Sequence, residues 1–424
     1  MSDEVTPPRH SGKHRVFLLA NITLAAVTIL AGSGLLYANW RLNNRKVVTI
    51  DSVNNAGGVD LPLGDLQAKN FLITGSDNNA CIAKDSPYAG GFGVRSAFGE
   101  RSDSIMVIRV NPIDNQAAVL SFPRDMWVKQ AGSTRHGRIN TNFDKKNPNI
   151  LIRTIKENFG ISVDHYVNID FCAFKEVIDA VGGVRVPFIN KSRDTHTGFK
   201  VLKSNVCYTF AGDHALAYMR SRHYQWYDPA LNKWRTDQSS DWGRIARQQD
   251  FIRRLVKKAL DKARTNPAVA TGILNAVLKN VITDDRLNPL TVLQLGQAMK
   301  NFDANTMGSY TMPGLGQLID KASVIVPDLV SDQSIKILSV FQGKASLSAT
   351  VKQTAYGASS AQFSELTTVI AATSAVRVSL SKPTATSTTT STTTTTTTTT
   401  TIPSVVIEQV TKGIVPPNDP TCQF

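Results

Sequence analysis

RSDSIMVIRVNPIDNQAAVLSFPRD, residues 101–125, is the stretch on which the predicted fold depends most. Two apolar runs, 105–110 and 117–122, are separated by 111–115, which is rich in turn-forming residues. Apolar runs of this length on either side of Asn, Pro and Asp are typical of two strands joined by a loop. The stretch therefore predicts a β-hairpin.

Charged residues lie at both outer ends of this hairpin. Arg101 and Asp103 precede or open the first run, and Arg124 and Asp125 follow the second. Because a hairpin brings its outer ends together, two carboxylates and two guanidiniums are expected at one rim. Carboxylates bind hard cations and guanidiniums bind phosphate oxygens, so the combination favours a site for a metal-bound polyphosphate. Two surface salt bridges beside a hairpin are the alternative.

The overall composition limits the classes of partner. The chain has 424 residues, enough for a sizeable core with additional tails. Its formal net charge of +14 indicates an anionic partner such as nucleic acid, lipid head groups or a phosphorylated substrate. The sequence contains no recognition helix or base-stacking motif, which argues against nucleic acid. The predicted membrane anchor and Thr-rich segment, described below, argue against it as well.

The N-terminal part predicts a membrane anchor. Residues 16–40 carry no charged side chain and exceed the roughly 20 apolar residues that span a bilayer. A cleaved signal peptide is the alternative, although its apolar region normally has only about 7–15 residues. A short cytoplasmic segment, 1–15, and a large C-terminal part favour an N-in, C-out orientation with the catalytic part outside the cell. Residues 41–65 are expected to form a linker.

Strand-like and helix-like segments alternate along 66–332. This alternation predicts one α/β domain with a central mixed β-sheet flanked by helices, an α-β-α layered arrangement. Besides the hairpin, the expected strands are 71–74, 163–171, 184–188, 308–312 and 323–326. The expected helices are 149–159, 174–181, 211–218, 244–263, 267–281 and 289–302.

The patterns weaken beyond this domain. Residues 333–382 form an extension of uncertain role. Residues 383–403 are a Thr-rich low-complexity segment, expected to be disordered or an O-glycosylated stalk. Residues 404–424 are expected to be a C-terminal tail.

Two groups of cationic and polar residues have spacings that suggest shared faces. Arg220 and Arg222 are separated by one residue, which in extended backbone puts both guanidiniums on one face. Arg244, Arg247 and Gln248 lie within one turn of a predicted helix and are expected to share a face. Each of these residues alone would more often be a solvated surface residue, but the paired spacing favours a function.

The four cysteines are too few for a disulfide scaffold and lack metal-ligand spacing. Cys81 and Cys207 both fall in predicted loops near the expected site, so a bridge between them is plausible if the compartment is oxidising. Cys172 is interpreted as a buried thiol. The sequence around Cys422 indicates no role for this cysteine.

Short motifs follow one another along the chain. They are Gly75-Ser-Asp77, Arg101-Ser-Asp103, Leu120-Ser-Phe-Pro-Arg124-Asp125, Arg138-Ile-Asn140, Val163-Asp-His-Tyr-Val-Asn-Ile-Asp170-Phe, Val181-Gly-Gly, Ala215-Leu-Ala-Tyr-Met-Arg220-Ser-Arg222-His and Arg244-Ile-Ala-Arg247-Gln248-Gln249. Each motif alone is weak. The ordered series resembles the LytR-CpsA-Psr family of cell-envelope phosphotransferases.

The resemblance implies an activity. It implies transfer of a glycopolymer from a polyprenyl (di)phosphate carrier to a cell-wall acceptor, such as a peptidoglycan sugar hydroxyl, with formation of a phosphodiester and assistance by Mg²⁺. The implied partners are the lipid-linked glycopolymer, peptidoglycan and the membrane. Nucleic acid is not among them.

The resemblance also implies roles for individual residues. Asp77 and Asp103 would be the metal-associated carboxylates. The residues implied to clamp the pyrophosphate are Arg124, Arg220, Arg222, Arg244 and Gln248, and the further substrate contacts are Arg101, Arg138, Asn140 and Arg247. Asp125 would act either as a general base for the acceptor hydroxyl or as an orienting partner of Arg124.

The chemistry fits the residue types, but more than one function fits them too. Phosphoryl transfer depends on positioning and on neutralising phosphate charge, which arginines and Mg²⁺ provide. The same site with water as acceptor would be a membrane-bound polyprenyl pyrophosphate phosphatase. A transcription-regulatory protein and a non-catalytic envelope-binding protein are also compatible with the sequence.

Residues 273–281 and 290–295 would line an apolar groove for the lipid tail, or simply pack in the core.

Overall fold

The computed structural model describes residues 46–51, 67–78, 80–89, 102–265, 281–287, 289–353 and 403–422. The predicted anchor at 16–40, the predicted Thr-rich segment at 383–403 except for its last residue, and Arg101 lie outside these ranges. In the part of the chain that is described, no helix combines the length and the apolar character that crossing a bilayer requires.

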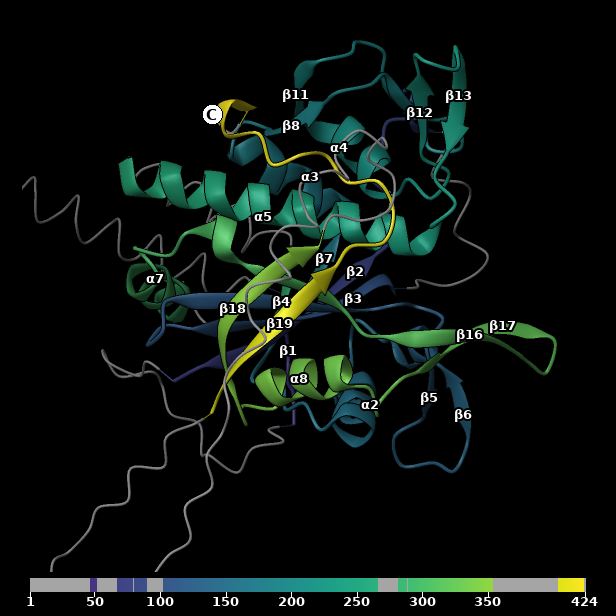
Figure 1. The fold of residues 1–424 in the computed structure, drawn as a ribbon. Helices are drawn as coiled ribbons and strands as arrows, with labels where there is room; N and C mark the ends of the chain where they lie inside the picture. The colour runs from purple at the N-terminus through teal and green to yellow at the C-terminus, as the bar shows by residue number, and fades with distance from the viewer. Residues whose placement is uncertain are drawn as a thin grey trace, which may run out of the picture.

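A seven-stranded mixed sheet forms the centre of the molecule (Figure 1). Three neighbouring pairs are parallel, β1 with β14, β7 with β2 and β4 with β15, and the others are antiparallel. In spatial order the strands are β1 (Val47–Val48), β14 (Ile282–Asp284), β7 (His165–Asp170), β2 (Lys69–Ser76), β3 (Ser102–Asn111), β4 (Gln116–Phe122) and β15 (Gly308–Thr311). The predicted central mixed sheet is confirmed, and β1 lies within the segment predicted to be a linker.

The hairpin predicted from 101–125 is confirmed as β3 and β4. The two strands pair in register from Ile105 with Phe122 to Asn111 with Gln116. Asn115 adopts a left-handed backbone conformation at the turn (φ 53°), which Asn tolerates better than most residues. Successive side chains of a strand point to opposite faces, and the apolar residues of these strands lie in clusters on both sides of the sheet.

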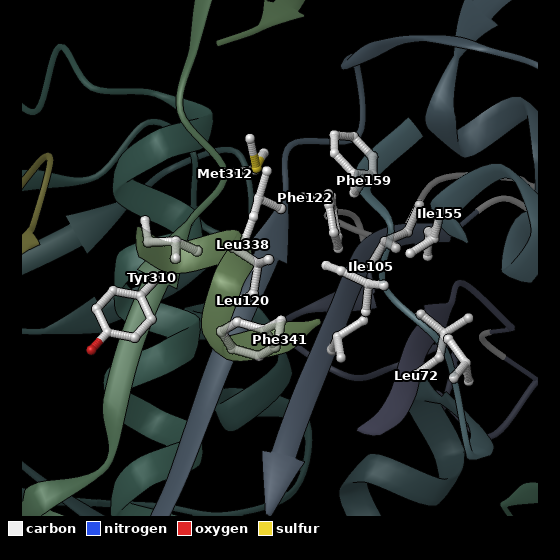
Figure 2. Close-up of a cluster of buried hydrophobic side chains, with 14 of the residues drawn as sticks. Leu72, Ile105, Leu120, Phe122, Ile155, Phe159, Tyr310, Met312, Leu338 and Phe341 are labelled. Atoms are coloured by element: carbon white, nitrogen blue, oxygen red, sulfur yellow. The ribbon is translucent and has the colours of Figure 1, made fainter. Parts of the chain in front are cut away.

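Helices cover both faces of the sheet. On one face, α2 (Asn149–Phe159) and α8 (Asp332–Phe341) pack against the hairpin (Figures 1 and 2). On the other face, α5 (Asp241–Thr265) packs against the sheet, and Leu295 of α7 (Pro289–Ala298) lies against the same cluster. The α-β-α layered arrangement is therefore confirmed. Leu295 packs in the core, as the second of the two alternatives for 290–295 expects for this residue, whereas 273–280 lie outside the described residues.

A second group of elements covers the other side of α5, next to its N-terminal half. It contains α3 (Phe171–Ala180), α4 (Gly212–Met219), the paired strands β8 (Val184–Phe188) and β11 (Val206–Phe210), and a four-stranded sheet in the order β10 (Phe199–Val201), β9 (Ser192–Asp194), β12 (Gln225–Asp228) and β13 (Lys233–Thr236). Its core is aromatic and includes Phe251 of α5. This contact joins the second core to the helix that covers the main sheet.

Two smaller hairpins lie beside the main sheet. One consists of β5 (Trp127–Lys129) and β6 (His136–Arg138), followed by the 3-10 helix η2 (Ile139–Asn142). The other, β16 (Gly314–Ile319) with β17 (Ala322–Pro327), projects from the body of the molecule in Figure 1. The strand predicted at 323–326 thus belongs to this hairpin and not to the central sheet.

The C-terminal part packs on the main core. The parallel pair β18 (Ser346–Gln353) and β19 (Ser404–Val410) follows α8. Phe341, Leu347 and Ile407 are buried in the same cluster as the hairpin residues. The expected boundary at 332 therefore does not coincide with a boundary of the packing, and 404–422 is not a detached tail. The strand pairing joins segments far apart in the chain, which local patterns cannot reveal.

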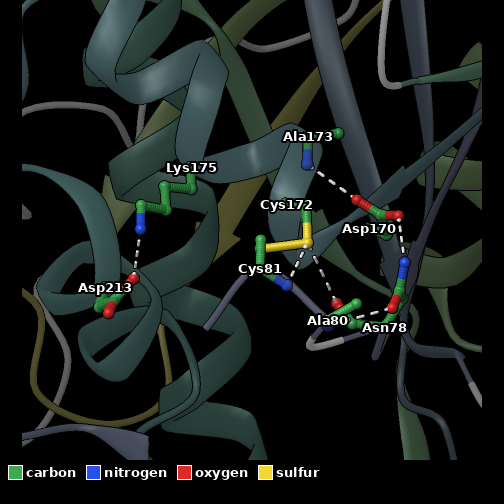
Figure 3. Close-up of a disulfide and its surroundings, with 8 residues drawn as sticks. All are labelled: Asn78, Ala80, Cys81, Asp170, Cys172, Ala173, Lys175 and Asp213. Atoms are coloured by element: carbon green, nitrogen blue, oxygen red, sulfur yellow. Dashed lines mark hydrogen bonds and ion pairs between the residues drawn. A yellow bond between two sulfur atoms is a disulfide. The ribbon is translucent and has the colours of Figure 1, made fainter. Parts of the chain in front are cut away.

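The disulfide pairing differs from the prediction. Cys81 is bonded to Cys172 (Figure 3), and Cys207 is bonded to Cys422. The predicted bridge between Cys81 and Cys207 is therefore wrong, and Cys172 is not a thiol. The strand order of the central sheet brings Cys81 and Cys172 together. β2 and β7 are parallel neighbours, and the two cysteines lie just beyond the carboxyl ends of these strands. The second bridge attaches the chain end to β11.

Candidate active site

Asp103 lies between two arginines from distant parts of the chain. Its Oδ1 is 2.8 Å from Nη1 of Arg124, which follows β4, and its Oδ2 is 3.3 Å from Nη2 of Arg222, which follows α4. The predicted meeting of the two hairpin ends is therefore confirmed for Asp103 and Arg124. Arg222 joins them because the second group of elements packs at this edge of the sheet.

Asp241, in the first turn of α5, binds two arginines at once. Its Oδ1 accepts a hydrogen bond from Nε of Arg222 at 2.9 Å and lies 2.8 Å from Nη2 of Arg244. The same Arg244 nitrogen donates to the carbonyl oxygen of Asp103 at 2.9 Å. The sequence interpretation missed Asp241, although an acidic residue three positions before an arginine in a first helical turn was a usable signal.

Asp125 links Arg124 to the neighbouring hairpin. Its oxygens are 3.3 Å from Nε of Arg124 and 3.3 Å from Nε of Arg138. Arg138 also donates to the carbonyl oxygen of Ser323 in β17 at 3.0 Å. The backbone N–H of Asn140 donates to the carbonyl oxygen of Arg124 at 3.3 Å, which places this residue beside the others.

These residues form one connected set, which we call the arginine cluster. Its members are Asp103, Asp125, Asp241, Arg124, Arg138, Arg222 and Arg244. Four guanidiniums and three carboxylates leave one net positive charge. Several side chains are also partly accessible, with exposed fractions of 30% for Arg124 and 26% for Arg222. The cluster can therefore accept an anion.

Electrostatics keep Asp103 ionised. Burial alone would raise the pKa of its carboxyl, but the charges of Arg244 and Arg222, with the hydrogen bond from Arg124, lower that pKa to about 2. The same contacts raise the pKa of Arg124, whereas burial lowers the pKa of Arg244. Nε of Arg244 is buried and has no hydrogen-bond partner within the described ranges, so it remains a donor for an additional group.

Gln248 and Arg247 point in different directions from α5. Gln248 accepts a hydrogen bond from Ser104 Oγ at 3.3 Å and donates to the Met219 carbonyl at 3.0 Å, next to the cluster. Arg247 is instead buried, with Nη1 2.8 Å from Asp237 Oδ2. The expectation of a shared face with Arg244 thus holds for Gln248 and is wrong for Arg247, because at 3.6 residues per turn positions three and four ahead fall on opposite sides of the starting residue.

Arg220 and Asp77 lie at the neighbouring strand ends. Arg220 has helical backbone dihedrals (φ −95°, ψ −5°) as the C-cap of α4, so the premise of an extended Arg220–Arg222 segment is wrong. Its guanidinium lies over the ring of Phe171, 5.1 Å from the centroid. Asp77 is buried directly after β2, whose last residue pairs with β3 at Ser102. Asp77 and Asp103 are therefore at the same edge of the sheet.

Comparison with known proteins identifies the family. The model of the LytR_cpsA_psr family matches residues 42–338, well over half of the chain. The chain belongs to the LytR_cpsA_psr family. The family resemblance drawn from the ordered motifs is thereby confirmed.

A curated relative is similar in sequence, and two solved structures share the fold. The polyisoprenyl-teichoic acid–peptidoglycan teichoic acid transferase TagU of Bacillus anthracis is 30% identical over 203 residues, 48% of this LytR_cpsA_psr chain and 59% of the relative. The chain thus matches about three fifths of that relative's length. A LytR-Csp2A-Psr enzyme from Actinomyces oris shares the fold, with a TM-score of 0.52 at 20% identity over 70% of this chain and 96% of that one. TagV of B. subtilis has a TM-score of 0.51 at 23% identity, covering 66% and 99%.

Proposed function

We propose that this protein transfers a glycopolymer from a polyprenyl (di)phosphate carrier to a hydroxyl of a cell-wall acceptor such as a peptidoglycan sugar, with formation of a phosphodiester. The single observation that supports this most is the arginine cluster, in which Arg124, Arg222 and Arg244 from three separate elements surround Asp103. Membership of the LytR_cpsA_psr family and the activity named for TagU point to the same chemistry.

The arginine cluster would bind the diphosphate of the donor. Guanidiniums form paired hydrogen bonds with phosphate oxygens, and their charge offsets the repulsion between the phosphates and an incoming hydroxyl. The free Nε donor of Arg244 and the accessible faces of Arg124 and Arg222 supply such contacts. Gln248 and Arg220 lie next to the same elements and would complete the clamp.

In the transfer step, the acceptor hydroxyl oxygen forms a bond to the sugar-side phosphorus. The bridging P–O bond breaks and the polyprenyl phosphate leaves with the electron pair, while the hydroxyl proton is released. Asp125 faces Arg124 and Arg138 with its two oxygens, which favours an orienting role over that of general base. Arg138 and Asn140 would help to hold the sugar-side phosphate. Arg247, which points away from the arginine cluster, would hold α5 in position.

Asp77 and Asp103 would hold Mg²⁺ together with the phosphates. The part of the chain that is described contains no group of three or more acidic, His or Cys side chains suited to a metal. Mg²⁺ typically binds one or two carboxylates plus substrate phosphates and water, so two carboxylates at one sheet edge fit it. The pKa of about 2 keeps Asp103 in the anionic form that ligation needs. When bound, the ion would neutralise phosphate charge.

We further propose that residues 16–40 anchor the protein in the cell membrane as a single span, with the catalytic domain outside the cytoplasm. The donor's lipid tail requires this proximity. Two disulfides, Cys81–Cys172 and Cys207–Cys422, suit an oxidising compartment. Protease accessibility on intact cells tests the orientation.

The function is tested with the full-length protein in lipid vesicles. The donor is a polyprenyl-diphosphate-linked glycopolymer, the acceptor is uncrosslinked peptidoglycan, and both the phosphodiester product and polyprenyl phosphate are measured. Arg124→Ala should reduce transfer by a factor of about 100 or more, as for removal of a transition-state donor. Arg153→Ala, an exposed arginine on α2, is the matched control and should leave the rate unchanged.

Three results would contradict parts of the proposal. Release of polyprenyl phosphate at the same rate with and without acceptor, with no linked product, would identify a phosphatase instead. Equal activity of Arg124→Ala and Arg153→Ala would remove the cluster from the reaction. A chelator that leaves transfer unchanged would contradict the proposed role of Mg²⁺.

A further inference from the structure

The four-stranded sheet of β10, β9, β12 and β13 has one face that none of the proposed steps uses. Its inner face is buried: Phe199 and Val201 lie in the aromatic core and Trp226 packs against it. The register places Lys200 opposite Arg193, Arg193 opposite Gln225, and Tyr227 opposite Trp234. Because residues paired across a sheet share a face, these side chains lie together on the outer face.

We call this outer face the aromatic platform. It is formed by Arg193, Lys200, Gln225, Tyr227, Trp234 and Thr236, with Lys191 at its edge. The guanidinium of Arg193 lies 4.0 Å from the centroid of the Trp234 ring, and Tyr227 meets Trp234 edge-to-face at 5.6 Å. The strands of this sheet contribute no carboxylate to this face. The platform therefore combines two rings with three cations.

The platform is built as an insertion between residues of the arginine cluster. β12 begins three residues after Arg222, and β13 ends five residues before Asp241. Hydrogen bonds attach this sheet to the residues on either side of Arg222, since Asp194 of β9 accepts from Ser221 Oγ at 2.7 Å and from the His223 N–H at 2.9 Å. Tyr227 follows Arg222 by five residues, so at about 3.3 Å per extended residue it lies within about 17 Å.

We infer that the aromatic platform binds the acceptor strand of peptidoglycan. The inference rests on the proposed function, in which the arginine cluster neutralises the donor diphosphate and contains no aromatic surface on which the sugar rings of the acceptor could stack. Aromatic rings stack on the C–H faces of pyranose sugars, and tyrosine and tryptophan are the usual anchors of such surfaces. The carboxylates of peptidoglycan stem peptides match the charges of Lys191, Arg193 and Lys200.

Nucleic acid also combines rings with negative charge, but the platform favours the glycan. Arg193 covers one face of the Trp234 ring and is fixed by its hydrogen bond from Nε to Gln225 Oε1 at 2.9 Å, and Tyr227 lies edge-to-face against the same ring, so the two rings do not form a slot between parallel faces for a base. The attachment of both ends of β12 and β13 to the cluster places the bound strand beside the reacting phosphate. This arrangement is what an acceptor requires.

Binding of full-length protein in lipid nanodiscs to uncrosslinked peptidoglycan strands with intact stem peptides tests the inference. Trp234→Ala and Tyr227→Ala should each weaken binding by about tenfold, the usual effect of losing an aromatic anchor. Lys200 is exposed, so Lys200→Gln leaves the core packing intact. This substitution should weaken binding to strands with stem peptides more than binding to strands from which the peptides were removed. Leu231→Ala, 51% exposed in the turn between β12 and β13, is the matched control.

Turnover separates this inference from the proposed function. Hydrolysis of the lipid-linked donor in the absence of acceptor should be unchanged in Trp234→Ala, whereas the KM for peptidoglycan in the transfer reaction should rise about tenfold. A wild type that binds peptidoglycan through the platform but never processes the donor would contradict only the function. Equal peptidoglycan affinity of Trp234→Ala, Tyr227→Ala and Leu231→Ala would overturn the inference. It would also be overturned if the platform variants lost affinity only for the lipid-linked donor or only for single-stranded nucleic acid.

Discussion

Asp103 and Arg124 are 21 positions apart in the chain, and their side chains meet at 2.8 Å. Asp103 is the second residue of β3 and Arg124 is the second residue after β4, so the register of a single hairpin brings them together. Arg222, in the segment after α4, and Arg244, in α5, contact the same aspartate. Asp103 thus connects the local β3–β4 hairpin to arginines that are more than 100 positions away in the chain.

Asp103→Asn should lower the stability of the protein in a pH-dependent way. The folded-state pKa of about 2 lies below the ordinary value of 3.8, so ionised Asp103 stabilises the fold above about pH 4. This contribution, about 2 kcal/mol, is lost as the pH falls from about 4 to about 2. Urea unfolding of both proteins across this range measures it.

Asp114→Asn, in the exposed turn of the same hairpin, is the control for this experiment. Its effect should stay below about 0.5 kcal/mol at every pH. If the difference between Asp103→Asn and the wild type were the same at about pH 2.5 and at neutral pH, the ion pairs would not be the source of the stabilisation.

Asp241→Ala should slow transfer without abolishing folding. Removing the carboxylate releases Arg222 and Arg244 from their shared partner, so kcat should fall about 10- to 100-fold through loss of orientation. Asp241→Glu should restore part of the rate. Asp332→Ala, an exposed first-turn aspartate of α8 that pairs with Lys336, should have no effect on kcat. A similar loss in both alanine variants would indicate a general effect on helix stability.

Ile407→Ala should destabilise the whole catalytic domain. Ile407 is buried in the main core although β19 lies beyond the Thr-rich segment. The cavity should cost about 2–5 kcal/mol in the free energy of unfolding, measured in urea. Val406→Ala, at a 49% exposed neighbouring position, should cost far less. Separate unfolding transitions for the two parts of the chain would contradict a common core.

Loss of the second disulfide should also destabilise the protein. Cys207→Ser with Cys422→Ser opens a covalent loop with a sequence separation of 215, which typically costs about 2–5 kcal/mol. Thermal unfolding should show a lower Tm than that of the oxidised wild type, and a reductant should lower the Tm of the wild type in the same direction. Thiol labelling of unfolded wild-type protein that found free cysteines would contradict the pairing.

The local parts of the site were predictable. The hairpin, the helix carrying Arg244 and Gln248, and the position of Arg124 near Asp103 follow from periodicity and turn residues within short windows. The burial and the partners of Arg247 were not predictable in the same way, because Asp237 and the carbonyl of Ile414 come from other segments. Sequence spacing gives the position of a side chain on a helix but not what packs there.

What the sequence alone determined is the set of residues that bear charge, the family to which their order belongs, and the hairpin that joins two of them. The tertiary structure decided which distant partners meet: Asp241 with two arginines, Cys172 with Cys81, and β18 with β19. The physical reason is that local backbone preferences act over a few residues. Ion pairs, disulfides and core packing are selected only when the whole chain has brought remote segments into contact.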